Sequence, residues 1–223
     1  MTVDTITEAV RALLVQDSQK GGLHVLLFGS CAKESDIDMC AITRSAVQYE
    51  QVRVGRLDLT IIPPEAAAAL TVRRDILMCE VLSAGTVIIR DEAIAATLAD
   101  SQKAGACLSE IVEHHFNQSL RARMMADAYL QAYRADTNSW ELASRVLDSL
   151  AWCTSYFLAA RCYRQRGGTA AIGYPQLLTE PGGDTLAAVR QARVRFRTGE
   201  PLTTQGLLAV RAFVDALLLG SPS

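Results

Sequence analysis

The sequence predicts an α+β protein in which a small mixed-sheet domain, residues 1–95, is followed by a C-terminal helical bundle domain, residues 96–223. Short apolar runs bounded by Gly, Pro or polar residues occur in the first part of the chain and are typical of strands. After residue 95, helical spacing of apolar residues takes over. Because 50% of the residues are hydrophobic, the chain can bury a core.

The first element expected is a helix. Thr5 and Glu8 have the spacing of a capping box, and apolar residues at helical spacing follow them. The helix is expected to end near Gly21 and Gly22, because glycine favours helix ends. The same segment lacks a basic stretch followed by an apolar one, so it does not resemble a signal peptide.

Four strands and one helix are expected in the rest of the first domain. The strands are predicted at residues 24–28, 36–42, 53–62 and 86–90. Two prolines, Pro63 and Pro64, close the third strand. A helix is expected over much of 65–84, ending at Gly85.

Four helices are expected in the second domain. Their predicted ranges are 104–134, 138–166, 183–198 and 203–219. The connection 167–182 is rich in Gly and Pro and is expected to form a loop or turns.

Composition excludes several classes of protein. The net charge of −2 argues against a protein that coats nucleic acid by bulk electrostatics. The six cysteines include no Cys-x-x-Cys pair, which makes a structural zinc site improbable. No apolar stretch is long enough to cross a membrane, and a reducing cytoplasm is the expected setting.

Three aspartates form the candidate catalytic and metal-binding group. Asp36 and Asp38 are separated by one residue, so they share a face if they lie in a strand. Asp58 stands between Leu57 and Leu59 in the next predicted strand, where a buried carboxylate is unusual. Neighbouring carboxylates are costly unless a cation binds them, and Mg²⁺ prefers oxygen ligands. The alternatives without a functional role are a solvated turn for the Asp-x-Asp pair and a solvent-facing strand position for Asp58.

Gly29, Ser30 and Lys33 are the candidate phosphate-binding residues. A glycine at the end of a strand allows the backbone to approach a phosphate, and the following amides and the Ser30 hydroxyl can donate to its oxygens. Lys33 can add a positive charge to the same anion, or it can be a surface lysine. Cys31 follows Ser30 directly and could make such a site sensitive to alkylation.

The order Gly29-Ser30, Asp36-x-Asp38 and a later strand aspartate, Asp58, resembles the DNA polymerase β-type nucleotidyltransferase superfamily. Within it, the chain is most similar to minimal nucleotidyltransferases and aminoglycoside adenylyltransferases of bacteria. The resemblance is specific over 23–62 and extends weakly through 72–90. The segment between Ser30 and Asp36 is shorter than these families usually have, which implies that the short helix there is reduced.

The resemblance implies a nucleotidyltransferase domain that binds a nucleoside triphosphate, ATP by default, through Gly29 and Ser30. Asp36, Asp38 and Asp58 would bind two Mg²⁺ ions, with Asp58 on the acceptor side as a possible base. The implied reaction transfers a nucleoside monophosphate to a hydroxyl and releases pyrophosphate. A small-molecule acceptor is favoured, because minimal enzymes are usually shorter. The alternatives are a protein- or RNA-modifying enzyme of the antitoxin type and a non-catalytic nucleotide-binding module.

The second domain contains weaker candidates. Glu110 and His114 share a helix face, and Glu113 and His115 lie beside them, so this group could supply a base or simply form a solvated face. A basic run could contact an anionic acceptor such as RNA or lie on a solvated helix face; it contains Arg190, Arg193, Arg195 and Arg197. The aromatic residues are most simply part of the core; they are Trp140, Trp152, Tyr156, Phe157 and Tyr163.

Overall fold

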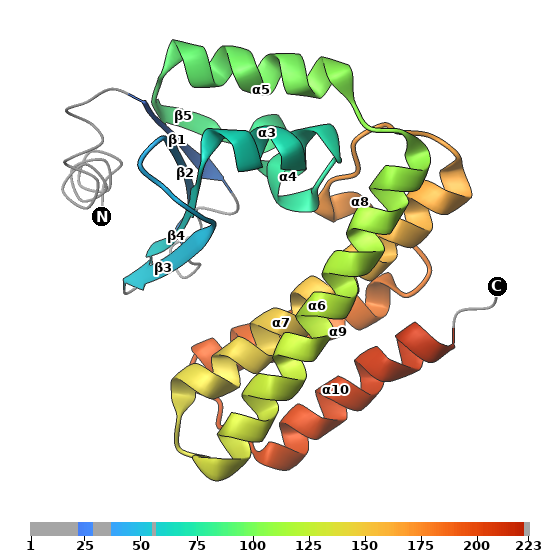
Figure 1. The fold of residues 1–223 in the computed structure, drawn as a ribbon. Helices are drawn as coiled ribbons and strands as arrows, with labels where there is room; N and C mark the ends of the chain where they lie inside the picture. Colours follow the sequence, from blue (N-terminus) through green and yellow to red (C-terminus); the bar gives the residue numbers. More distant parts are fainter. Residues whose placement is uncertain (1–21, 29–36, 55–56, 221–223) are drawn as a thin grey trace. The chain divides into compact units, whose positions relative to one another are not determined.

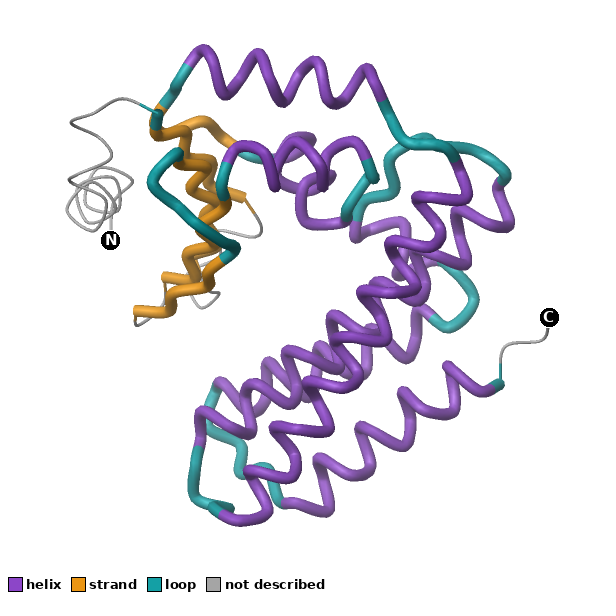
Figure 2. The backbone as a smooth tube through the Cα atoms, viewed as in Figure 1, coloured by secondary structure: helices purple, strands orange, loops and turns teal. Residues whose placement is uncertain are grey.

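The computed structural model describes residues 22–28, 37–54 and 57–220 (Figure 1). A five-stranded sheet and a mostly helical C-terminal part confirm the α+β class (Figure 2). The chain divides into two compact units, residues 1–106 and 107–223. The expected division at residue 95 falls inside helix α5 (Glu92–Ala104), which belongs to the first unit.

The sheet of the first unit is mixed. Its strands are β1 (Leu23–Phe28), β2 (Ile37–Thr43), β3 (Glu50–Val54), β4 (Leu57–Ile62) and β5 (Thr86–Ile89). Their order across the sheet is β3-β4-β2-β1-β5. The pair β2–β4 is parallel, whereas β1–β2, β1–β5 and β3–β4 are antiparallel. The parallel pair therefore lies inside the sheet, and it carries Asp38 on one strand and Asp58 on the other.

The single strand expected at 53–62 was wrong, because two antiparallel strands, β3 and β4, occupy residues 50–62 with 55–56 between them. Residues 55 and 56 lie outside the described residues. The sequence holds the reason: Gly55 interrupts the apolar alternation, and a two-residue separation containing glycine is typical of a hairpin.

The single helix expected over 65–84 was also wrong, because α3 (Pro64–Val72) and α4 (Ile76–Ala84) are separate helices. Arg74 between them adopts a left-handed backbone with φ of 54°, which ends the first helix. The buried Asp75 then caps the second helix, since its carboxylate accepts a hydrogen bond of 3.0 Å from the Leu77 amide.

In the first unit, helices α4 and α5 contact strand β1, and helix α3 contacts strand β2 (Figure 1). Register pairing places Leu26 with Cys40 and Phe28 with Asp38, so these side chains share one face of the sheet. A side chain at Gly85, the end of α4, would meet Leu26, which shows that α4 packs on this face. The opposite face carries an apolar cluster; it comprises Leu23, Val25, Ile37, Met39, Ala41, Leu57 and Leu59.

The second unit consists of helices α6 (Leu108–Ala135), α7 (Trp140–Arg166), α8 (Tyr174–Thr179), α9 (Gly183–Arg197) and α10 (Thr204–Leu219). Helices α6 and α7 pack along one another, and α9 and α10 pack against α7 (Figure 2). The four long helices agree with those expected. The connection expected to be a loop contains the short helix α8, which starts with Pro175 in its first turn, where proline costs little.

Two ion-pair groups join the helices of the second unit. Arg123 of α6 binds Asp215 of α10 through two hydrogen bonds of 2.8 and 3.0 Å. Arg193 and Arg197 of α9 both bind Asp148 of α7, at 2.5 and 3.2 Å. These contacts complement an apolar core cluster between the same helices, which includes Leu147, Leu150 and Val189.

Candidate active site

Asp38 and Asp58 are direct neighbours in the sheet. They are register partners on the parallel strands β2 and β4, so their side chains leave the same face from strands about 4.8 Å apart. Asp38 is half-buried, and Asp58 is only 6% exposed. The expectation that Asp58 lies on the face of Asp38, rather than on the opposite face or in solvent, agrees with this register.

Strand β4 positions Asp58 because its neighbours are apolar. Leu57 and Leu59 point to the opposite face and join the apolar cluster there, so the alternation of the strand leaves Asp58 on the face of Asp38. A carboxylate buried beside a second carboxylate is costly without hydrogen-bond donors or a cation. This placement makes Asp58 a candidate functional residue.

The structure adds one residue that sequence reasoning missed. The side-chain amide of Gln51 in β3 donates a hydrogen bond of 2.7 Å to Oδ1 of Asp58. Gln51 is the register partner of Thr60, two residues along β4 from Asp58, so it reaches its acceptor diagonally across the strand pair. The sequence offers one signal for this contact, namely the polar Gln51 shortly before Asp58. That signal becomes informative only once the register of β3 with β4 is known.

Tyr49 and Thr60 extend the same polar surface. A side-chain hydrogen bond links Tyr49 to Thr60. Although Tyr49 as a whole is 48% exposed, desolvation of its hydroxyl raises the pKa of that group to about 12. Tyr49 therefore stays protonated at neutral pH. It can donate a hydrogen bond but cannot act as a base there.

Several candidate residues lie outside the described residues. These are the phosphate-binding candidates Gly29, Ser30 and Lys33, together with Cys31 and the first metal ligand, Asp36. Strand β2 begins at Ile37, directly after Asp36. Within the described part of the chain, no group of three or more His, Cys, Asp or Glu residues could hold a metal ion. Asp38 and Asp58 offer carboxylate oxygens, the kind of ligand that Mg²⁺ prefers.

The helical candidates of α6 have structural contacts. The Glu110 carboxylate accepts a hydrogen bond of 3.0 Å from the Cys107 amide and so caps the helix. His115 is fully buried, with Nδ1 2.7 Å from the Ile111 carbonyl oxygen, so Nδ1 carries the proton. His114 is half-buried and meets Tyr156 edge-on, and Glu113 is exposed. Among them, Glu113 presents an exposed carboxylate that neither caps the helix nor joins the core.

The basic run of α9 is engaged within the second unit. Arg193 and Arg197 bind Asp148, and burial lowers the pKa of Arg197 to about 10. The guanidinium of Arg190 lies 4.3 Å from the centre of the Tyr174 ring. These contacts favour a structural role for the run over contact with RNA.

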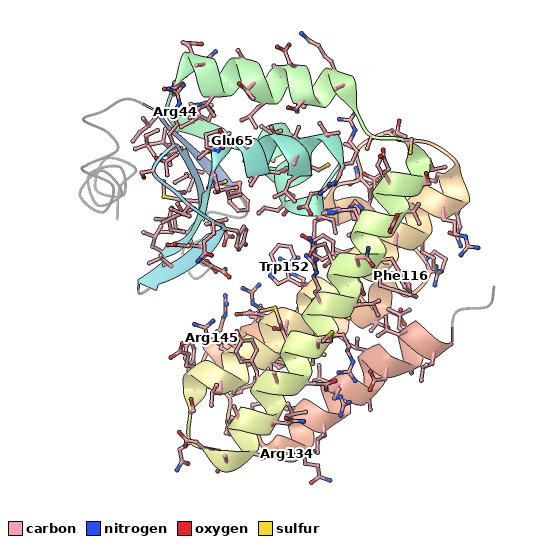
Figure 3. The ribbon with its side chains drawn as sticks, in the orientation of Figure 1. Arg44, Glu65, Phe116, Arg134, Arg145 and Trp152 are labelled. Atoms are coloured by element: carbon pink, nitrogen blue, oxygen red, sulfur yellow. The ribbon has the colours of Figure 1, made fainter. Side chains whose placement is uncertain are left out.

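The aromatic residues of α7 are divided between core and surface. Phe157 and Tyr163 are buried, whereas Trp140 is half exposed. Trp152 stacks on Tyr156 at 5.8 Å between ring centres, and it projects from α7 as Phe116 does from α6 (Figure 3). The core position expected of these residues is therefore confirmed for Phe157 and Tyr163 and is wrong for Trp140.

No protein-family model matches the sequence, and no curated protein matches it significantly. In the described residues, no helix is both long and apolar enough to cross a membrane.

Proposed function

We propose that this chain is a Mg²⁺-dependent nucleotidyltransferase that moves a nucleoside monophosphate, with ATP as the expected donor, onto a hydroxyl of a small-molecule acceptor. The supporting observation is the register of Asp38 and Asp58, which lie side by side on one face of the sheet although they come from different strands. The resemblance of the motif order to DNA polymerase β-type enzymes predicts this arrangement.

The proposed roles follow from the chemistry of the residues. Asp38 and Asp58, together with Asp36, would hold Mg²⁺, which when bound supplies positive charge to the phosphates and acidity to the acceptor hydroxyl. Gly29 would leave room for the triphosphate, and Ser30 would donate a hydrogen bond to it. These donors would hold the α-phosphate in place for attack.

The reaction forms one bond and breaks one. The acceptor oxygen attacks the α-phosphorus, and the bond from that phosphorus to the oxygen bridging the α- and β-phosphates breaks. Pyrophosphate leaves with the bridging oxygen. The hydroxyl proton passes to a carboxylate on the acceptor side, for which Asp58 is the candidate because it is buried and held in orientation.

A small molecule is the preferred acceptor class. The chain carries its own helical unit, and the basic run of α9, the best candidate for an RNA contact, is engaged with Asp148 and Tyr174. An RNA or protein acceptor would need another docking surface.

The test is the variant Asp38→Asn. It removes one ligand charge, so it should lose Mg²⁺-dependent ATP binding and reduce turnover on the order of 10²-fold or more. Calorimetry with and without Mg²⁺ measures binding, and pyrophosphate release over a panel of hydroxyl acceptors measures turnover. Asp100→Asn, an exposed aspartate on α5, makes the same charge change away from the site.

Turnover of Asp38→Asn equal to that of Asp100→Asn would rule out the metal-binding role. Mg²⁺-independent ATP binding without pyrophosphate release by the wild-type chain would instead identify a non-catalytic nucleotide-binding module.

A further inference from the structure

Gln51 donates a hydrogen bond directly to a candidate catalytic carboxylate. Its amide nitrogen donates to Oδ1 of Asp58 over 2.7 Å, and both partners lie on the face of the sheet that carries Asp38. Asp58 is 6% exposed, so little water reaches it to replace a lost donor. The bond connects strand β3 at the edge of the sheet with β4 inside it.

The geometry gives this bond an orienting function. A carboxylate in a strand is free to turn about its last torsion, which has a broad energy well. A donor fixed to one oxygen limits that rotation, so Asp58 presents its two oxygens in a constant direction relative to Asp38. Charge-assisted bonds of this kind are about twice as strong as neutral ones.

Gln51 is exposed, and a second polar contact lies beside it on the same hairpin. Tyr49, two residues earlier, is bonded to Thr60, which is the register partner of Gln51. The hairpin β3–β4 therefore carries two successive polar contacts on one face, and the second of them ends on Asp58. On the other face of β3, Glu50 pairs with Ile61 and is exposed.

We propose that Gln51 is a positioning residue, which orients Asp58 for metal binding and for the chemical step without contacting substrate. This role rests on the proposed nucleotidyltransferase function for its chemical consequence, but its effect on metal binding is measurable without turnover. Outer-shell donors to metal-binding carboxylates typically contribute roughly 10–100-fold to metal affinity or activity.

The experiment compares Gln51→Leu and Gln51→Glu with Glu50→Leu in the full chain. The first variant removes the donor at similar size, and the second keeps the polarity but cannot donate when ionised. Glu50→Leu adds the same apolar group to the opposite face of the same edge strand. Paramagnetic resonance of free Mn²⁺ measures metal affinity, and pyrophosphate release measures kcat and the KM for ATP.

Gln51→Leu should bind Mn²⁺ about 10-fold or more weakly than wild type, while Glu50→Leu stays within about 3-fold. Both Gln51 variants should lose kcat by about 10-fold or more with little change in the KM for ATP, because the triphosphate is assigned to other residues. A merely structural role would instead lower the melting temperature without separating kcat from KM.

The outcomes separate the two proposals. Loss of Mn²⁺ affinity in Gln51→Leu, in a chain that shows no turnover, would keep the positioning role and overturn nucleotidyl transfer. Equal Mn²⁺ affinity in wild type, Gln51→Leu and Glu50→Leu, including no binding by any of them, would overturn the positioning role.

Discussion

At the scale of single residues, Asp38 and Asp58 illustrate how strand alternation determines the face of the sheet on which a side chain lies. Alternation alone predicts that Asp58 leaves the face opposite to Leu57 and Leu59, and the register of β2 with β4 places it beside Asp38. Two adjacent carboxylates repel one another when no cation is bound. A neutral replacement at either position should therefore leave the fold intact or slightly more stable in metal-free buffer.

The two aspartates should differ in their effect on catalysis. Asp58→Asn keeps an oxygen that can accept the Gln51 hydrogen bond, so Mg-ATP binding should stay within a few-fold of wild type. Its kcat should fall on the order of 10²-fold or more, since the amide is not a base. Calorimetry and the kcat of pyrophosphate release check both expectations.

Asp38→Asn is the comparison for this result, because it should lose Mg²⁺-dependent binding as well as turnover. If Asp58→Asn lost binding as completely as Asp38→Asn while keeping its kcat at saturating nucleotide, the acceptor-side role of Asp58 would be wrong.

The contact between Gln51 and Asp58 could not be predicted from the sequence. It is a diagonal contact between β3 and β4, and it exists because the hairpin places Gln51 opposite Thr60. A one-residue change of register would turn Gln51 to the other face. The expectation of one long strand over 53–62 placed Gln51 outside any strand, so its partner could not be inferred.

At the scale of elements, the joint between β1 and α5 has a titratable contact. His24 is buried, and its Nδ1 accepts a hydrogen bond of 3.2 Å from the Asp91 amide. The Asp91 carboxylate caps α5 through the Ile94 amide and also accepts from the Gly22 amide, each at 2.9 Å. This joint ties the start of β1 to the start of α5.

Acid should loosen this joint. Burial lowers the pKa of His24, and Arg90 lowers it further, although Asp91 and Glu92 act against both. Because the pKa of His24 is lower in the folded chain, the unfolded chain binds a proton at His24 more readily. The joint is therefore fully stabilised above the unfolded pKa of about 6.5, and its free energy of unfolding decreases as the pH drops below that value. Protonated Nδ1 cannot accept the Asp91 amide. Hydrogen exchange of the β1 peptide, corrected for its intrinsic pH dependence, should show protection falling between about pH 7 and 5.

His24→Asn is the diagnostic variant because an amide oxygen can accept the same hydrogen bond without titrating. Protection of β1 in this variant should depend less on pH. His114→Asn, in the second unit, should leave the wild-type pH dependence of β1 unchanged. An unchanged pH dependence in His24→Asn would show that another group causes the acid effect.

Element boundaries followed the sequence where local signals were strong. Helices α6, α7, α9 and α10 and strands β1, β2 and β5 lie within a few residues of the ranges expected. The break between α3 and α4 was missed because it depends on a left-handed Arg74, a conformation that sequence rarely reveals outside glycine. The Asp75 cap that follows was the readable signal.

At the scale of the whole molecule, the chain has two cores. The apolar cluster on the sheet contains Val25 and Met39, and the helical cluster contains Leu147 and Val189. The contrast between strand-like and helical periodicity predicts two domains, but the place of α5 depends on tertiary packing, since it contacts α3 and β1. A mutation that destabilises one core should therefore have an effect on unfolding that can be measured separately from unfolding of the other.

Asp148 offers such a test in the second unit. It binds Arg193 and Arg197 at once and is itself only 20% exposed. Asp148→Asn removes the carboxylate that two partly buried guanidinium groups share, which should destabilise the unit by roughly 1–3 kcal/mol. Both tryptophans of the chain, Trp140 and Trp152, lie in α7, so tryptophan fluorescence during denaturation reports on this unit alone.

Glu141→Gln is the matched control on the same helix. It breaks the ion pair with Arg145, a residue that projects from α7 (Figure 3), and makes the same change of charge. Because these partners are 71% and 52% exposed, the loss should stay below about 0.5 kcal/mol. Asp148→Asn should also leave protection of the β1 peptide and Mn²⁺ affinity at wild-type values, because both belong to the first unit. Equal fluorescence midpoints for the two variants would mean that the Asp148 ion pairs contribute no more than exposed ones, and the destabilisation expected for Asp148→Asn would be wrong.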